Sequence, residues 1–344
     1  MRLHLLILLF AVNSIFCSSA KSQTIGGNSV FNFLKFSNTP QLSASGGINI
    51  SQQTMDVAMA FNNPALLRPE MNKQLAAVFT SLAAGIGNYH SMIAFHARKI
   101  NTDFSTGVHF LNYGKVQLTD AAGNIQGTFH PVDYVVQVSA AQPFKEQWHY
   151  GITLKYIGSF YGTYRSSGIA ADFGVTYSDE KNLLQIAFVA KNMGSQLKTY
   201  SAEKEDLPFD VQLGISKKLR NAPVQFSITA HHLHQFDIRY ADTIFAEQSS
   251  SKKFTADKIF RHFVLGTQFF IGDKIELSAG YNHLRRSELS ISSAGNGLNG
   301  FSGGLGILFS KLQIRYARAY YQSNRAFNQL GISLKLDDYF DFSK

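Results

Sequence analysis

The chain has 344 residues, a formal net charge of +9 and a hydrophobic content of 45%, but only 16% of its residues are charged. Soluble domains carry about 25% charged residues, so this composition argues against both a disordered chain and an ordinary soluble domain. Beyond the N-terminus, no apolar run approaches the roughly 18–20 residues of a membrane helix, which argues against a helical membrane protein.

The N-terminus has the pattern of a secretory signal peptide over residues 1–22. A positively charged start and a mostly apolar core precede the small residues Ser18 and Ala20, which permit cleavage after Ala20. Cleavage after Ser22 fits equally well, and a membrane anchor is the alternative for the whole segment. The only cysteine, Cys17, would leave with this peptide, so the mature chain is expected to use neither disulfides nor a cysteine nucleophile.

Residues 23–72 come next and do not alternate cleanly between apolar and polar positions. Two glycine pairs, at 26–27 and 46–47, and the prolines Pro40 and Pro64 interrupt the segment. We predict that it folds into the interior of the following strand domain as an N-terminal plug. A periplasmic extension is the alternative.

From residue 73 to residue 344, apolar and polar residues alternate with a period of two, which is typical of β-strands. Ile152 and Leu154, for example, flank the polar Thr153. Fourteen such strands are predicted, beginning near residues 73, 88, 103, 132, 147, 167, 183, 207, 222, 260, 274, 299, 311 and 328.

The connections between these strands alternate in length along the chain. One set is short and comprises 101–102, 144–146, 179–182, 218–222, 272–273 and 310–311. The other set comprises 84–87, 114–131, 160–166, 193–206, 234–259, 285–298 and 321–327. Outer-membrane barrels have short periplasmic turns, long extracellular loops and an even number of strands, whereas a soluble sandwich has no reason to sort its loops. We therefore predict an all-β fold, a transmembrane antiparallel β-barrel in the bacterial outer membrane with periplasmic termini.

Three segments resemble a known family. Residues 25–34, the Asn-Pro-Ala element at 63–67 and residues 207–223 together resemble the PorV/FadL-like outer-membrane barrels of the type IX secretion system. The Asn-Pro-Ala element is shared with the wider FadL-like group, whereas the other two segments are more specific. The resemblance covers essentially the whole mature chain. One departure is the chain end, residues 337–344, which does not finish on a terminal aromatic residue.

This resemblance implies a non-enzymatic component of a cell-surface attachment complex, with no cofactor. Such a barrel would hold a PorZ-like, lipopolysaccharide-binding protein, together with a PorU-like sortase and a cargo-carrying PorV-like barrel. The sortase would release exported cargo, which is then linked to lipopolysaccharide. The alternative is a FadL-like transporter of a hydrophobic small molecule. Nucleic acid is not an expected partner, because the basic residues are spread along the whole chain.

Candidate partner-binding residues lie in the predicted outer loops, because the strands are committed to lipid contact and pairing. They are Phe236, Tyr240, Phe245, Lys252, Lys253, Arg285 and Arg286. Apolar residues beside lysines suit docking of a protein near anionic lipid, and an arginine pair suits lipopolysaccharide phosphates. Ordinary solvated loops are the alternative.

His231, His232 and His234 are the nearest approach to a metal-ligand cluster. Strand alternation would place His232 and His234 on one face and His231 on the other, with no carboxylate beside them. We therefore interpret them as a polar strand end and predict neither a metal site nor a catalytic site. The glycine-rich stretch 303–306 is interpreted as a strand bend or a place where the plug packs closely.

Overall fold

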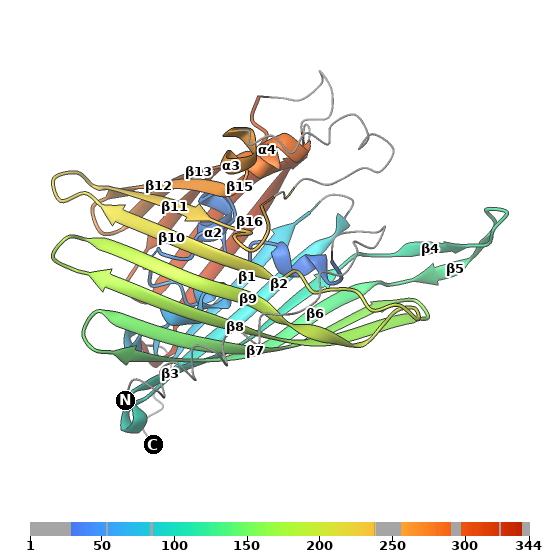
Figure 1. Ribbon diagram of the computed structural model, residues 1–344, viewed down its shortest axis with the longest axis horizontal. Helices are drawn as coiled ribbons and strands as arrows, with labels where there is room; N and C mark the ends of the chain where they lie inside the picture. Colours follow the sequence, from blue (N-terminus) through green and yellow to red (C-terminus); the bar gives the residue numbers. More distant parts are fainter. Residues whose placement is uncertain are drawn as a thin grey trace, which may run out of the picture.

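The computed structural model describes residues 29–52, 54–82, 85–236, 238, 256–289, 297–322 and 325–338. Within these residues, fourteen antiparallel strands form one closed barrel (Figure 1). The barrel strands are β1 (Gln74–Ser81), β2 (Gly87–Ala97), β3 (Thr102–Asn112), β6 (Val132–Phe144), β7 (Trp148–Tyr161), β8 (Tyr164–Asp179), β9 (Leu184–Lys198), β10 (Asp210–Lys218), β11 (Val224–Ala230), β12 (Phe263–Ile271), β13 (Ile275–Asn282), β14 (Phe301–Leu308), β15 (Leu312–Gln322) and β16 (Arg325–Lys335). The ring closes where β1 pairs with β16, with Gln74 opposite Lys335. The predicted fold class is confirmed.

Two further strands, β4 (Val116–Thr119) and β5 (Ile125–Phe129), form a hairpin outside the ring. They occupy the connection 114–131, which the sequence analysis treats as a loop. Another predicted loop is a tight turn instead, because β7 continues to Tyr161 and β8 already begins at Tyr164. The barrel strands otherwise begin within a few residues of the predicted positions.

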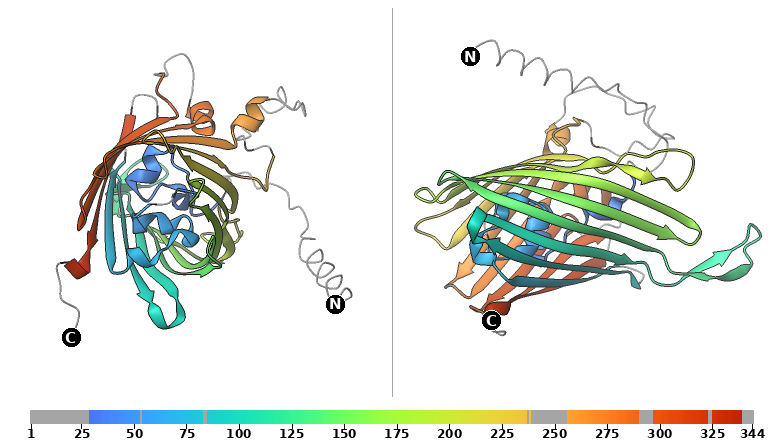
Figure 2. Two further views of the ribbon diagram at one scale, coloured as in Figure 1. Left: turned by 90° about the vertical axis from the view of Figure 1, so that its left-hand side faces the viewer. Right: turned by 90° about the horizontal axis from the view of Figure 1, so that it is seen from below.

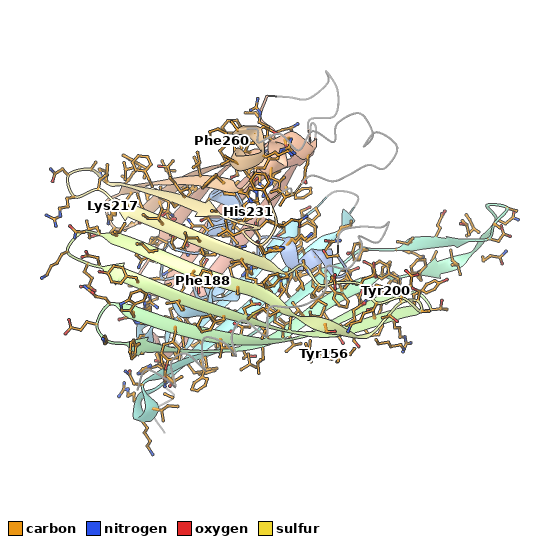
Figure 3. All side chains as sticks on the ribbon, viewed as in Figure 1. Tyr156, Phe188, Tyr200, Lys217, His231 and Phe260 are labelled. Atoms are coloured by element: carbon orange, nitrogen blue, oxygen red, sulfur yellow. The ribbon has the colours of Figure 1, made fainter. Side chains whose placement is uncertain are left out.

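Side chains alternate between the two faces of the barrel wall, and the apolar ones point outward. On β7, Ile152 and Leu154 are 50% and 62% exposed, whereas Lys155 is buried on the lumen side. Tyr156 and Phe188, labelled in Figure 3, belong to the same exposed set. An apolar outer face is what lipid contact requires, and a closed ring leaves no unpaired strand edge in the membrane. The protein is therefore a membrane-spanning barrel of the outer-membrane type.

The connections are sorted by length between the two ends of the barrel. The short-turn end carries connections such as 144–148 and 271–275, whereas the long-loop end carries 112–132, 230–263 and 282–301. The helix α3 (Ala256–Phe260) and the helix α4 (His283–Leu289) belong to the long-loop end, and η6 (Arg98–Ile100) and η8 (Leu336–Asp338) belong to the short-turn end.

The barrel wall is much taller on one side than on the other (Figure 1). The strands β6 to β9, here called the long wall, have 13, 14, 16 and 15 residues. The strands β10 to β14, here called the short wall, have 9, 7, 9, 8 and 8 residues. A tilted strand needs roughly 9–11 residues to cross a membrane. The long wall therefore extends beyond the membrane at the long-loop end, whereas the short wall has no residues to spare.

Residues 29–72, here called the inner segment, lie inside the barrel as a chain of short helices (Figure 2). These are η1 (Asn32–Lys35), α2 (Pro40–Ala44), η2 (Val57–Phe61), η3 (Pro64–Leu66) and η4 (Pro69–Met71). Three of them begin at a proline, whose fixed φ suits the first helical position. The side chains of Asp56 and Asn63 cap η2 and η3 by accepting from the backbone N–H groups of Ala58 and Ala65. None of the helices in the described residues is long and apolar enough to cross a membrane.

Glycines in the wall allow the inner segment to approach the strands closely. A Cβ atom added at Gly304 on β14 would lie 2.7 Å from the Cβ of Ala44, and one added at Gly151 on β7 would lie 2.7 Å from the carbonyl carbon of Pro64. The interpretation of 303–306 as a place of close packing is therefore correct at Gly304. The interior core lies between the inner segment and the strands, where Phe61, for example, is 1% exposed.

Candidate functional site

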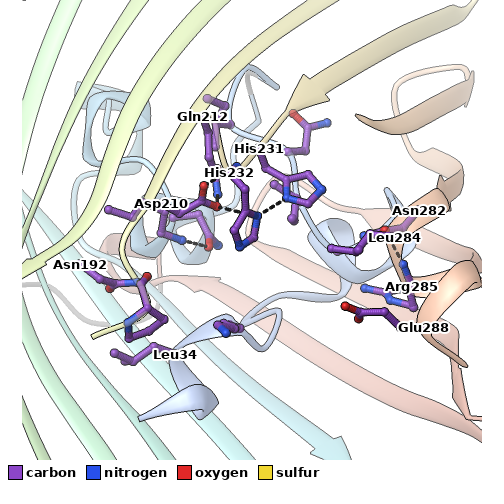
Figure 4. A pocket seen from close by; sticks show the side chains of 18 residues that line it. Leu34, Asn192, Asp210, Gln212, His231, His232, Asn282, Leu284, Arg285 and Glu288 are labelled. Atoms are coloured by element: carbon purple, nitrogen blue, oxygen red, sulfur yellow. Dashed lines mark hydrogen bonds and ion pairs between the residues drawn. The ribbon is translucent and has the colours of Figure 1, made fainter. Parts of the chain in front are cut away.

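A pocket of about 260 Å³ lies at the long-loop end, between the inner segment, the short wall, α4, and Lys191 and Asn192 of β9 (Figure 4). We call it the mouth pocket. Its lining includes Lys35, Asn49, Asp210, His231, His232 and Arg285. These residues come from η1, the part of the inner segment that follows α2, the start of β10, the residues after β11, and α4. The pocket is therefore built from segments that are far apart in the sequence.

The antiparallel pairing of β10 and β11 brings Asp210 to the two histidines. β10 begins at Asp210 and β11 ends at Ala230, with Leu213 opposite Ala230 in the shared register. Asp210 therefore lies beside the residues that directly follow β11. The backbone N–H of His232 donates to Asp210 Oδ1 at 2.6 Å.

The predicted arrangement of the three histidines is wrong. β11 ends before them, and His232 has a φ of 54°, in the left-handed region, so strand alternation does not continue. The rings of His231 and His232 meet instead, with their Nδ1 atoms 2.5 Å apart (Figure 4). The nearby carboxylate that the sequence analysis did not find is Asp210, whose Oδ2 lies 3.9 Å from His232 Nδ1. His234 is exposed and packs on Phe209, with ring centroids 4.9 Å apart.

Burial lowers the pKa of both histidines of the pocket, which favours their neutral forms. The side chain of His231 is almost fully buried, and burial lowers its pKa to about 3. Burial also lowers the pKa of His232, against the opposing effect of the Asp210 carboxylate. Neutral imidazoles have a lone pair on one ring nitrogen, so both rings can act as ligands.

His262, which lies just before β12, holds the backbone of His231 in place. The N–H of His231 donates to the carbonyl of His262 at 2.9 Å, and His262 Nδ1 lies 2.8 Å from the carbonyl oxygen of His231. The other ring nitrogen, Nε2, lies 3.0 Å from the carbonyl oxygen of Phe236. Phe236, a predicted partner-binding residue, is 56% exposed.

The two predicted arginines lie in different surroundings, because neighbouring residues on a helix point in different directions. Arg285 lines the mouth pocket, and its guanidinium group lies against Gly47 of the inner segment. Arg286 is exposed on the same helix, α4. The other predicted partner-binding residues, Tyr240, Phe245, Lys252 and Lys253, lie outside the described residues.

A second pocket of about 490 Å³ lies at the same end, between η1 and the long wall. Three tyrosines surround Asp133 there. The hydroxyl groups of Tyr113 and Tyr161 donate to Asp133 Oδ2 at 2.6 and 3.0 Å, and the ring of Tyr200 lies 5.9 Å from that of Tyr161. Burial raises the pKa of Tyr200 to about 12. This tyrosine pocket has no local sequence signal, because Tyr113 and Tyr200 lie on two connections and Asp133 and Tyr161 on two strands, β6 and β7.

Known proteins resemble this chain in structure but not in sequence. No protein-family model and no curated protein matches it. The Pseudomonas putida toluene transporter TodX is similar with a TM-score of 0.51 and 11% identity, over 87% of this chain and 97% of that one. A Pseudomonas aeruginosa FadL homologue has a TM-score of 0.45 and 9% identity, over 87% and 98% of the two chains. The likeness to TodX shows that the two proteins share a barrel fold.

Proposed function

We propose that the chain is a PorQ-like outer-membrane scaffold of the type IX secretion system. It would hold a PorZ-like surface protein beside the PorU-like sortase and the PorV-like barrel while exported cargo is released and linked to lipopolysaccharide. The segments at 25–34 and 207–223 support this reading by their resemblance to that family. The structural observation that carries it is the hairpin formed by β4 and β5.

The hairpin projects away from the barrel at the long-loop end, beyond the long wall (Figure 1). Its residues Val116, Leu118 and Ile125 are 37%, 51% and 61% exposed. An isolated two-stranded hairpin is marginally stable in water, and exposed strand edges invite pairing with another chain. Among the described residues, no strand pairs with the outer edges of β4 and β5. A partner protein that adds a strand to the hairpin would pair an open strand edge, and it would also cover the exposed apolar side chains.

The proposal places the long-loop end at the cell surface and the short-turn end in the periplasm. This orientation follows the usual arrangement of outer-membrane barrels, in which short turns are periplasmic. The hairpin and both pockets would then face the extracellular side, where lipopolysaccharide and surface proteins are present.

The proposed role requires no catalytic chemistry. Two histidines inside the barrel, His90 and His109, have a structural explanation, because both pack edge-on against the ring of Phe61 at centroid distances of 4.9 and 5.6 Å. His109 also contacts Asn88 through Nε2 at 2.5 Å. We therefore retain the prediction that the protein is not an enzyme.

Partner capture tests the scaffold role. Native outer membranes are solubilised in mild detergent, the barrel is captured by a C-terminal tag, and the co-purifying proteins are quantified. We expect PorZ-like and PorU-like proteins with the wild type, and at least a tenfold loss with Leu118→Ser/Ile125→Ser. The control Gln117→Ser/Thr128→Ser alters polar residues of the same hairpin and should retain the partners. Full recovery with the first variant would refute docking through the hairpin.

The second candidate is a FadL-like transporter of a hydrophobic small molecule, and the tyrosine pocket favours it. An aromatic-lined cavity of about 490 Å³ is large enough for a small ligand. Mass spectrometry of the purified barrel would identify bound lipid. If wild-type protein carries a lipid that Tyr161→Ala loses, and captures no partner protein, the transporter would replace the scaffold as the proposed function.

A further inference from the structure

We propose that Asp210, His231 and His232 bind a divalent transition-metal ion, with Zn²⁺ as the best fit. Each residue offers one ligand atom, and these atoms all lie within 4.8 Å of one another. A tetrahedral zinc ion with bonds of about 2.0–2.1 Å holds its ligand atoms roughly 3.4 Å apart. The two Nδ1 atoms, 2.5 Å apart, are closer than this and would separate by roughly 0.9 Å around the ion, whereas His232 Nδ1 and Asp210 Oδ2, 3.9 Å apart, would move slightly together.

The rings of the two histidines have few other protein partners. Their facing Nδ1 atoms can share one proton in an N–H···N hydrogen bond, and a cation could replace that proton and accept both lone pairs. His231 is 1% exposed, and its Nε2 has no hydrogen-bond partner among the described residues. Burying a polar atom without a partner costs about 1–3 kcal/mol, and this nitrogen is a second possible ligand atom of the His231 ring.

The surroundings already hold the ligands in place. Asp210 Oδ1 accepts from the backbone of His232 and Oδ2 accepts from Gln212 Nε2, both at 2.6 Å, which fixes the carboxylate. His262 contacts the backbone of His231 on both its N–H and carbonyl sides. Hydrogen bonds that orient ligands in this way are a regular part of metal sites.

The ligand types select the ion and leave room for a further ligand. Two imidazoles and one carboxylate suit Zn²⁺, whereas Ca²⁺ and Mg²⁺ prefer oxygen ligands throughout. With three protein ligands, the fourth position would face the mouth pocket, open to water or another small ligand. The ion would tie the start of β10 to the residues after β11, at the base of the connection 230–263.

Zinc titration of the full mature barrel in detergent tests the site. The protein carries an affinity tag without histidines, is stripped with a chelator, and then competes with a chromophoric chelator for Zn²⁺. We expect one equivalent to bind, and His231→Ala and His232→Ala to weaken binding by about 100-fold or more. Asp210→Asn should weaken it by at least about tenfold. Co²⁺ in place of Zn²⁺ should give a visible absorption band that Zn²⁺ abolishes.

His234→Ala is the matched control, because it removes a histidine two residues away that lies outside the cluster. It should bind zinc like the wild type. Heat-dependent gel mobility verifies that each variant barrel is folded. The proposal is overturned if the wild type binds no stoichiometric Zn²⁺ or gives no Co²⁺ band. It is equally overturned if His234→Ala loses as much affinity as His231→Ala.

Discussion

The long wall and the short wall use the same strand chemistry for different purposes. The long wall has strands of up to 16 residues and extends past the membrane, and the exposed hairpin comes directly before its first strand in the chain. The short wall has strands of 7 to 9 residues, and α3, α4 and the mouth pocket lie at its long-loop end. Strand length therefore decides what each side can present: the long wall carries the exposed hairpin, and the short wall borders the mouth pocket.

Charge in the lumen differs between the walls as well. On the long wall, Lys155 Nζ and Asp172 Oδ2 are 2.5 Å apart and have side chains only 1% and 0% exposed. Near the short wall, Arg315 and Glu276 are 3.8 Å apart, and the Glu276 carboxylate also accepts from Gln41 at 3.1 Å. The first is a close ion pair whose other polar neighbour is Asn192, which accepts from Lys155 Nζ at 3.0 Å and donates its backbone N–H to Asp172 Oδ1 at 2.7 Å. In the second pair, Glu276 accepts from several neutral donors.

The substitution that should destabilise the barrel most is therefore on the long wall. Lys155→Met leaves Asp172 as a buried charge without its cation and should lower the free energy of unfolding by about 3–5 kcal/mol. The loss is measured by denaturing the barrel in lipid or detergent and using gel mobility to determine the folded fraction. Lys155→Met/Asp172→Asn removes both charges and should recover most of it, because the amide oxygen can still accept from the N–H of Asn192. A double variant as unstable as the single one would contradict this account.

The next largest loss of stability should come from a substitution that disturbs the docking of the inner segment on β14. Gly304→Val would drive a side chain into Ala44 of α2, and such overpacking costs about 1–3 kcal/mol. Limited proteolysis of the inner segment should become faster in this variant. Gly303→Ala is the matched control, because its Cβ would meet only the carbonyl oxygen of Ser278, at 3.6 Å. Equal effects of the two substitutions would argue against close docking at this strand.

How far the sequence predicts this molecule depends on whether a feature is local. Period-two alternation and connection length identify the barrel strands because each strand carries its own signal. Asp210 and His231 come together only through strand pairing. The sequence does contain a signal for this contact. The predicted strands beginning near 207 and 222 are consecutive, so antiparallel pairing places the start of the first beside the end of the second. The left-handed backbone of His232 has no comparable signal.

The height of the long wall and the hairpin cannot be predicted from the sequence for a related reason. β8 begins at Tyr164 and β9 runs to Lys198, inside segments predicted as loops, because strands above the membrane no longer need clean apolar alternation. The hairpin strands are only 4 and 5 residues long and all but two of their residues are exposed, so they lack a buried face. The helices of the inner segment are likewise too short to give a periodic pattern.

Removing the cation near the short wall should cost less than removing Lys155. Arg315→Met should lower the free energy of unfolding by about 1–2 kcal/mol, because Glu276 keeps neutral donors from Gln41, Gln268 and Ser278. The same denaturation assay measures it. A loss equal to that of Lys155→Met would mean that the network does not share the charge of Glu276 and would remove this difference between the walls.

The smallest expected effect lies at the exposed cap of the short wall, where Asp257 of α3 pairs with His283 of α4 and with Arg261, at 2.9 and 2.8 Å. These hydrogen bonds hold the pKa of the Asp257 carboxyl below its usual value. Because the folded pKa is depressed, the stabilisation is present above the unfolded pKa of about 3.9 and is lost as pH falls through the folded pKa. Its size should be below about 1 kcal/mol, since the Asp257 side chain is 46% exposed.

Hydrogen exchange of the backbone amides of α3 tests this, with Asp257→Asn compared with wild type at each pH. At pH 7 the variant should exchange up to about fivefold faster, which corresponds to that energy. Below the folded pKa the ratio should approach one, because the wild-type carboxyl is then neutral as well. Asp273→Asn, at the short-turn end, should leave the exchange of α3 unchanged at both pH values. A ratio independent of pH would show that α3 is held in place by packing and not by the charge of Asp257.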